Sequence, residues 1–143
     1  MTDDVDATFS HRMLLPENLE IAYRGADGKA RLLYFDRQYN DTFGLLHEDA
    51  YRDSVPVKLK GLDPKLVEVR LLSPVDLAVT KLARFAAPDQ EDIKALAAKG
   101  LLSPDELKER AGEAMSNYVG NPSPVKTSIA LACKMIDANR PKR

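Results

Sequence analysis

The stretch LVEVRLLSPVDLAVTKLARFAAPDQEDIKALAAK, residues 66–99, decides the fold that we predict for this chain. Residues 66–72 alternate apolar and polar side chains before becoming fully apolar, which is typical of a short strand that enters a core. A helix follows, because Ser73 is suited to cap its N-terminus, Pro74 stands where a missing N–H costs nothing, and Asp76 favours the positive helix end. The stretch therefore predicts a strand that leads directly into a helix.

Charged residues follow on this helix and at the start of the next one. Lys81 and Arg84 are three residues apart, so a helix would place them on neighbouring positions of one face. Pro88 interrupts the pattern, and the run DQED at residues 89–92 opens a second helix with acids in its first turn. Two cations followed by a carboxylate cluster, all beside one strand end, are the most informative arrangement in the sequence.

Composition is that of an ordinary globular chain. The 143 residues are 44% apolar and 30% charged, with a net charge of −1, which argues against a general nucleic-acid-binding surface. No apolar run is long enough to span a bilayer, and no signal peptide is recognised at the start. The single Cys133 cannot form an internal disulfide and lies in an apolar helical pattern, which favours a buried, inert thiol. We expect a cytoplasmic protein.

Strand patterns gather in the first half of the chain and helical patterns in the second. A Gly- and Asp-Gly-containing turn at residues 25–29 predicts a hairpin between two strands, and capping residues at Ser103 and Ser123 predict the last two helices. We therefore predict an α+β fold in a single domain, residues 1–143, with a strand-rich region at 1–72 and a helical region at 73–138. The expected strands are residues 4–9, 19–24, 30–36, 45–47, 55–59 and 66–72.

The central stretch resembles the core of a bacterial and archaeal nucleotidyltransferase family that includes the abortive-infection (AbiE-type) toxins of toxin–antitoxin systems. The residues that carry the resemblance are Lys81-Leu82-Ala83-Arg84 and Glu91-Asp92-Ile93. The resemblance extends from about Thr2 to Ile136. It implies a minimal nucleotidyltransferase-like mixed sheet followed by a C-terminal helical bundle.

The resemblance also gives a role to the start of the chain, where Thr2-Asp3-Asp4-Val5-Asp6 matches a metal-binding strand of the family. Alternate strand residues point the same way, so Asp4 and Asp6 can share a divalent ion, and paired carboxylates suit Mg²⁺ bound to an NTP. Asp36 is the candidate third carboxylate. A strand-end acid that faces water is the alternative reading of Asp36.

By the same resemblance, Lys81 and Arg84 bind phosphates, and Asp92 is a catalytic base or an orienting partner of Arg84. The alternative is a purely structural role, in which Lys81 and Arg84 form ion pairs with Asp89 and Asp92 between the two helices. His11 and His47 have no ligand-spaced partner, so we expect both to be exposed and no zinc site to form.

Family members carry a Gly-Ser helix ahead of the metal-binding strand, and none precedes Met1 here. One hypothesis is therefore an enzyme whose natural start lies upstream and which transfers a nucleoside monophosphate from an NTP to a tRNA or a protein hydroxyl, with an antitoxin as partner. The other is a truncated, non-catalytic relative that acts as a binding or dimerisation module, for instance as a homodimer formed through an open edge strand.

Overall fold

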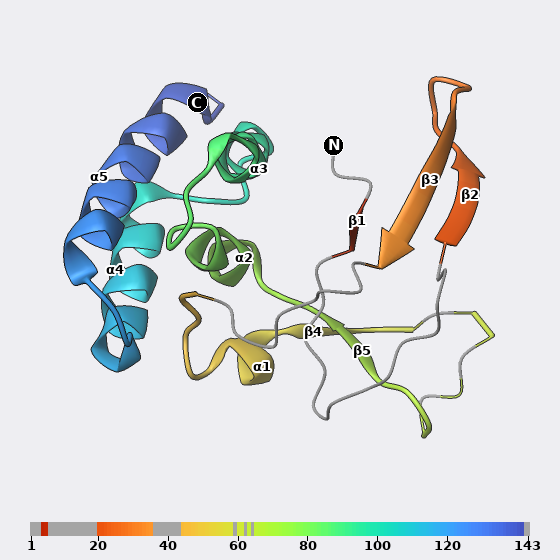
Figure 1. The fold of residues 1–143 in the computed structure, drawn as a ribbon, viewed down its shortest axis with the longest axis horizontal. Coiled ribbons are helices and arrows are strands. Elements are labelled where there is room, and N and C mark those ends of the chain that lie inside the picture. Colours follow the sequence, from red (N-terminus) through yellow and green to blue (C-terminus); the bar gives the residue numbers. More distant parts are fainter. Residues whose placement is uncertain are drawn as a thin grey trace. The chain divides into compact units, whose positions relative to one another are not determined.

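The structure, a computed structural model, describes residues 4–5, 20–35, 44–58, 60–61, 63 and 65–141. The chain divides into two compact units, residues 1–43 and 44–143 (Figure 1). Strands dominate the first unit and helices the second, so the predicted α+β class is confirmed. The assignment of all 143 residues to one domain stays a prediction.

The first unit contains a three-stranded sheet in the order β1-β3-β2. Strand β1 (Asp4–Val5) runs parallel to β3 (Ala30–Phe35), and β2 (Glu20–Arg24) pairs antiparallel with β3. The predicted hairpin between β2 and β3 is confirmed. Strand pairing in both directions within one small sheet makes it a mixed sheet.

The conformation of the hairpin loop between β2 and β3 depends on its glycines. Gly28 has a φ of +77°, a left-handed conformation that glycine adopts without strain. Its N–H donates to the Gly25 carbonyl at 2.9 Å, and the Gly25 N–H donates to the Lys29 carbonyl at 2.9 Å. These two bonds define a three-residue loop, residues 26–28, in which a tight turn ends in a left-handed residue.

The second unit begins with a short helix, α1 (Ala50–Asp53), and a two-stranded antiparallel sheet of β4 (Val55–Val57) and β5 (Val69–Leu71). Strand β5 is shorter than the predicted 66–72, because the N–H groups of Leu66 and Val67 both donate to the Asp63 carbonyl in a turn.

The strand predicted at residues 45–47 is wrong. Leu45 is a buried core residue at 2% exposure and lies in a bend, and the chain then turns into α1. The physical reason is that one buried apolar side chain is enough to hold a turn against the core. Two adjacent leucines therefore do not distinguish a strand from a turn.

Four helices form the rest of the unit: α2 (Pro74–Thr80), α3 (Ala87–Ala98), α4 (Pro104–Ala114) and α5 (Pro122–Asn139), with a 3-10 turn at Met115–Asn117. The predicted caps at Ser73 and Ser103 are confirmed, since each side chain accepts the N–H of the third residue after it. Helix α5 begins earlier than predicted, with Asn121 as its cap.

The expectation that one helix carries both Lys81 and Arg84 is wrong. Helix α2 ends at Thr80, residues 81–84 form a turn, and Phe85 takes a left-handed φ of 49°. Pro88 then sits in the first turn of α3, where its missing N–H costs nothing, rather than ahead of the helix. The chain therefore reverses direction tightly between α2 and α3.

The core of the second unit lies between these helices. Helix α5 packs against α3 and α4, and α2 packs against α4. The core contains large, fully buried apolar side chains from separate parts of the sequence, among them Val79, Leu82, Ile93, Leu107 and Ile136. Cys133 is half-buried against this core, and burial raises the pKa of its thiol, as expected for an inert cysteine.

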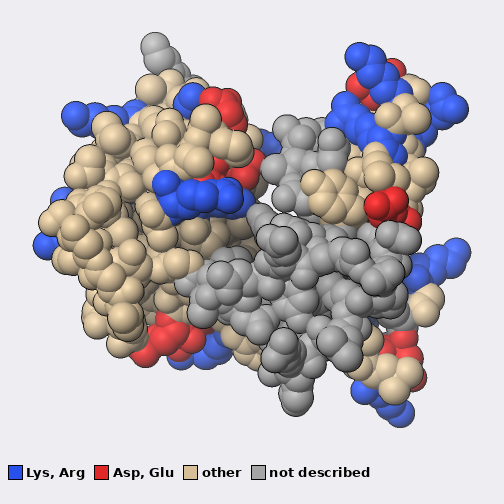
Figure 2. Space-filling view, viewed as in Figure 1, with Lys and Arg blue, Asp and Glu red and all other residues tan. Residues whose placement is uncertain are grey.

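Across the part of the chain that the structure describes, no helix has the length and apolar character needed to cross a membrane. On the face drawn in Figure 2, basic and acidic side chains are interspersed over the described surface. This distribution agrees with the nearly neutral net charge of the chain.

Candidate functional site

The turn between α2 and α3 brings together the four charged residues that the sequence singled out. Lys81 Nζ lies 3.3 Å from Asp92 Oδ2, and the guanidinium of Arg84 forms a two-pronged ion pair with Asp89. Lys81 also exerts a favourable charge interaction on Asp89, so the two pairs act as one group. We call Lys81, Arg84, Asp89 and Asp92 the turn cluster.

Asp89 is the anchor of the turn cluster. Its carboxylate accepts from Arg84 Nε at 2.8 Å, from Arg84 Nη2 at 2.7 Å and from the Ala86 N–H at 2.9 Å. The last bond satisfies a backbone donor at the start of α3. Burial raises the pKa of the Asp89 carboxyl, but the hydrogen bonds from Arg84 and Ala86 outweigh it, so the pKa lies below its ordinary value. Asp89 is therefore a permanently charged anchor for Arg84 at neutral pH.

The two cations differ in their exposure. The Lys81 side chain is 12% exposed, whereas that of Arg84 is 70% exposed although two of its nitrogens bind Asp89. An exposed guanidinium with a fixed orientation is suited to bind a phosphate, because its planar fork matches two phosphate oxygens. The carboxylate that orients Arg84 is Asp89, and Asp92 is the partner of Lys81.

The acidic residues predicted for metal binding belong to the first unit. Asp4 is the first residue of β1 and is opposite Tyr34 of β3, in the parallel register that also pairs Val5 with Phe35. Asp6 and Asp36 lie outside the described residues. Within the described ranges, no group of three or more His, Cys, Asp and Glu side chains is arranged to hold a metal ion. The magnesium ligands therefore stay a prediction.

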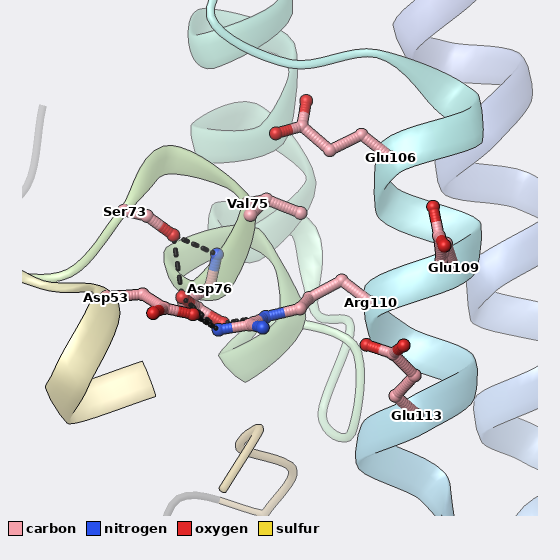
Figure 3. A pocket seen from close by; sticks show the side chains of 8 residues that line it. All are labelled: Asp53, Ser73, Val75, Asp76, Glu106, Glu109, Arg110 and Glu113. Atoms are coloured by element: carbon pink, nitrogen blue, oxygen red, sulfur yellow. Dashed lines mark hydrogen bonds and ion pairs between the residues drawn. The ribbon is translucent and has the colours of Figure 1, made fainter. Parts of the chain in front are cut away.

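A second concentration of charge lines a hollow of about 340 Å³ between α2, α4 and the end of α1 (Figure 3). Arg110 reaches from α4 to Asp76, donating from Nε at 2.7 Å and from Nη2 at 3.0 Å, and its Nη2 also donates to Asp53 at 2.9 Å. Asp76 is fully buried and accepts a further bond from Ser73 Oγ at 2.7 Å. This network ties three helices together.

The charge of this hollow is unsuited to a nucleotide. Its lining contains one cation, Arg110, and five carboxylates, since Glu106, Glu109 and Glu113 on α4 join Asp53 and Asp76 (Figure 3). Like charges at a few ångströms repel by roughly 1 kcal/mol or more even in water-like surroundings. A triphosphate would meet this repulsion, whereas the turn cluster balances two cations with two carboxylates and has no net negative charge. The turn cluster is therefore the better candidate for binding phosphate.

Sequence reasoning misses this network and misjudges His47. Arg110 is 34 residues from Asp76, a separation that gives no local signal, although an acid on the buried side of a capped helix could have indicated a cation partner. The expectation that His47 is exposed is wrong: it is 7% exposed, with Nε2 3.0 Å from Glu113 Oε2 and Nδ1 accepting the Asp49 N–H. A single histidine outside a motif has no pattern that reveals such partners. His11 lies outside the described residues.

The fold and the turn cluster together define a class: a small α+β protein with a mixed sheet and paired, carboxylate-anchored cations. The comparison with known families makes this specific. The model of the family described as "Nucleotidyltransferase of unknown function (DUF6036)" matches residues 1–132. The chain belongs to this nucleotidyltransferase family, and a nucleotidyltransferase takes a nucleotide as its substrate. No curated protein matches the chain, and no solved structure matches it.

Proposed function

We propose that this protein transfers a nucleoside monophosphate from an NTP to a hydroxyl group of a tRNA or a protein, in the manner of the abortive-infection toxins that its central stretch resembles. The hydroxyl oxygen forms a bond to the α-phosphorus and its proton is released to water, while the bond to the bridging oxygen breaks and pyrophosphate leaves. An antitoxin that masks this activity is the partner that the toxin reading implies.

The observation that carries the proposal is the family match, which spans both the acidic strand at Asp4 and the turn cluster. The parallel pairing of Val5 with Phe35 gives it further support. Asp6 follows Val5 in the sequence and Asp36 follows Phe35. The chemistry of this donor set, three carboxylates, suits Mg²⁺, which when bound would neutralise the triphosphate and favour in-line attack.

In this proposal Lys81 and Arg84 bind the phosphates of the NTP. Asp89 occupies Nε and Nη2 of Arg84 and so fixes the guanidinium, whose exposed part carries a positive charge to the phosphates, and Lys81 adds a compact positive charge. Asp92 lies against Lys81 at 3.3 Å, so an orienting role for Asp92 has more geometric support than a role as general base. Orientation of the triphosphate lowers the entropy cost of reaching the reactive geometry.

The direct test is label transfer from NTPs to RNA and protein acceptors. An NTP labelled in the α-phosphate should label an acceptor in the presence of Mg²⁺, and the same NTP labelled in the γ-phosphate should not, because the γ-phosphate leaves with pyrophosphate. The variants Asp4→Asn and Lys81→Ala should abolish the transfer. Lys94→Ala is the matched control, because Lys94 lies on α3 in an exposed pair with Glu91 outside the turn cluster.

Transfer by Asp4→Asn and Lys81→Ala at the wild-type rate would overturn the proposal. A protein that binds no NTP and labels no acceptor in any form would favour the second hypothesis, a non-catalytic relative that acts by binding. The specific observation in favour of that second hypothesis is the exposed outer strand β2, with Ile21 at 60% exposure.

A further inference from the structure

Among the strands that the structure describes, β2 forms one edge of the three-stranded sheet, and its outward backbone groups can be identified. The Gly25 N–H bonds to the Lys29 carbonyl, so the pair Gly25–Lys29 is a hydrogen-bonded pair of the ladder. In an antiparallel pair, hydrogen-bonded and non-hydrogen-bonded pairs alternate. Ile21 and Tyr23 therefore bond to β3, while the N–H and C=O groups of Glu20, Ala22 and Arg24 point to the outer edge.

The sequence of this strand, Glu-Ile-Ala-Tyr-Arg, is complementary to itself in the antiparallel direction. If two copies pair about Ala22, Glu20 of one copy lies opposite Arg24 of the other, and Ile21 lies opposite Tyr23. Opposite charges and aromatic–aliphatic pairs are the combinations that stabilise adjacent strands. The outward N–H and C=O groups at positions 20, 22 and 24 would fall opposite one another in the same register.

The side chains of β2 are exposed, so a second strand could pack beside them. Ile21 is 60% exposed and Tyr23 is 36% exposed, and all five residues of β2 are classed as exposed. Edge strands that must avoid pairing usually carry a proline, a bulge or several lysines. Within β2 there is no proline or lysine, and its two charged residues are of opposite sign.

We propose that β2 pairs with β2 of a second copy of this chain, about a two-fold axis at Ala22, to join two sheets into one. The contact is isologous, so each Glu20–Arg24 pair occurs twice. A five-residue strand pair is small, and small interfaces give weak, concentration-dependent dimers. The strand order β1-β3-β2 places β1, with the proposed metal ligand Asp4, at the opposite edge. The dimer therefore does not depend on the proposed transferase activity.

Sedimentation equilibrium of the 143-residue chain, from about 1 μM to about 1 mM, tests association. The wild-type average mass should rise from that of one chain toward that of two. Glu20→Arg and Arg24→Glu each place like charges opposite one another twice, so each should weaken the dimer on the order of tenfold or more. Lys29→Glu, a charge reversal in the same hairpin but outside β2, should leave association unchanged.

Two further experiments separate this interface from a folding defect. The double variant Glu20→Arg/Arg24→Glu restores opposite charges and should dimerise as the wild type does. An equimolar mixture of the two single variants should form a 1:1 heterodimer, because one chain then carries a cation at both positions 20 and 24 and the other carries a carboxylate at both. Each cation would face a carboxylate across the two-fold axis.

Ala22→Pro removes the outward N–H at the centre of the contact without breaking the ladder to β3, so it should abolish the dimer while the circular dichroism stays native. The proposal is overturned if the wild type is monomeric over the whole range. It is equally overturned if single reversals leave the dimer intact, or if their mixture stays monomeric.

Discussion

The ion pair between Asp76 and Arg110 should be among the most sensitive points of the second unit. Asp76 has no exposed surface, and the Arg110 side chain is 16% exposed, so water screens this pair weakly. Arg110 donates twice to Asp76, and Ser73 Oγ supplies a third bond to the same carboxylate. Removing either charge leaves the other buried with only part of its hydrogen bonds.

The expected magnitude follows from this burial. Removing one partner of a buried ion pair costs about 3–5 kcal/mol, because the remaining charge loses its compensation. Asp76→Asn and Arg110→Met should therefore each lower the free energy of unfolding by about this amount, a large part of the roughly 5–15 kcal/mol typical of a whole domain. The double variant should lose much less than the sum of the two single losses, because it leaves no unpaired charge. Urea denaturation followed by the helical circular dichroism signal measures all three.

Arg52→Met provides the matched control. Arg52 also contacts Asp53, but its side chain is 71% exposed, so its loss should change the urea midpoint little. If Asp76→Asn and Arg110→Met behaved like this control, or if their effects simply added in the double variant, the reasoning from burial and charge would be refuted.

Three further predictions concern the same unit. Hydrogen bonds hold the pKa of Asp89 below its ordinary value. The stability that Asp89 contributes is therefore present above the unfolded-state pKa of about 3.9 and is lost as the pH falls below that value. The urea midpoint of Asp89→Asn should lack this decline at acid pH. Gly44→Ala should lower the free energy of unfolding by about 1–3 kcal/mol, since a Cβ there would lie 2.6 Å from Cβ of Ala83, and adding Ala83→Gly should recover most of the loss. Ser103→Ala should cost about 1 kcal/mol by removing the cap of α4, measured by thermal denaturation.

The parts of the fold that could be predicted are those set by local chemistry. The caps at Ser73 and Ser103 and the left-handed Gly28 are fixed by interactions within a few residues, so a single sequence contains their whole signal. The turn between α2 and α3 shows the limit. Residues 81–84 have helical character in sequence, but the chain must reverse direction before α3 starts at Ala87, and Phe85 takes a left-handed conformation to do so.

The charged residues show the same limit. Ion pairs across a short loop, such as Arg84 with Asp89, are within reach of sequence reasoning as one of two readings. The partner of Asp76 is not, because Arg110 comes from a helix whose packing depends on the whole core. His47 is misjudged for the same reason, since Glu113 lies 66 residues away in the sequence. The spacing of residues in the sequence predicts contacts between near neighbours. A contact between two single polar residues that are far apart in the sequence produces no periodic pattern from which it could be predicted.

The exposure of Arg84 and its fixed orientation help to distinguish a phosphate-binding role of the turn cluster from a purely structural one. If its ion pairs served stability alone, the exposed Arg84 would contribute little, because the stabilisation from an ion pair falls with exposure to water. The same exposure is what a phosphate ligand requires, and the bonds from Asp89 already fix the guanidinium before any ligand arrives. Ordering a long side chain on binding costs about 0.5–1.5 kcal/mol, and a pre-ordered fork avoids much of this cost. If the turn cluster binds phosphate as proposed, Asp89→Asn should weaken NTP binding even though the Asp89 side chain is itself buried. A variant that bound NTP as tightly as the wild type would leave the cluster with its structural role only.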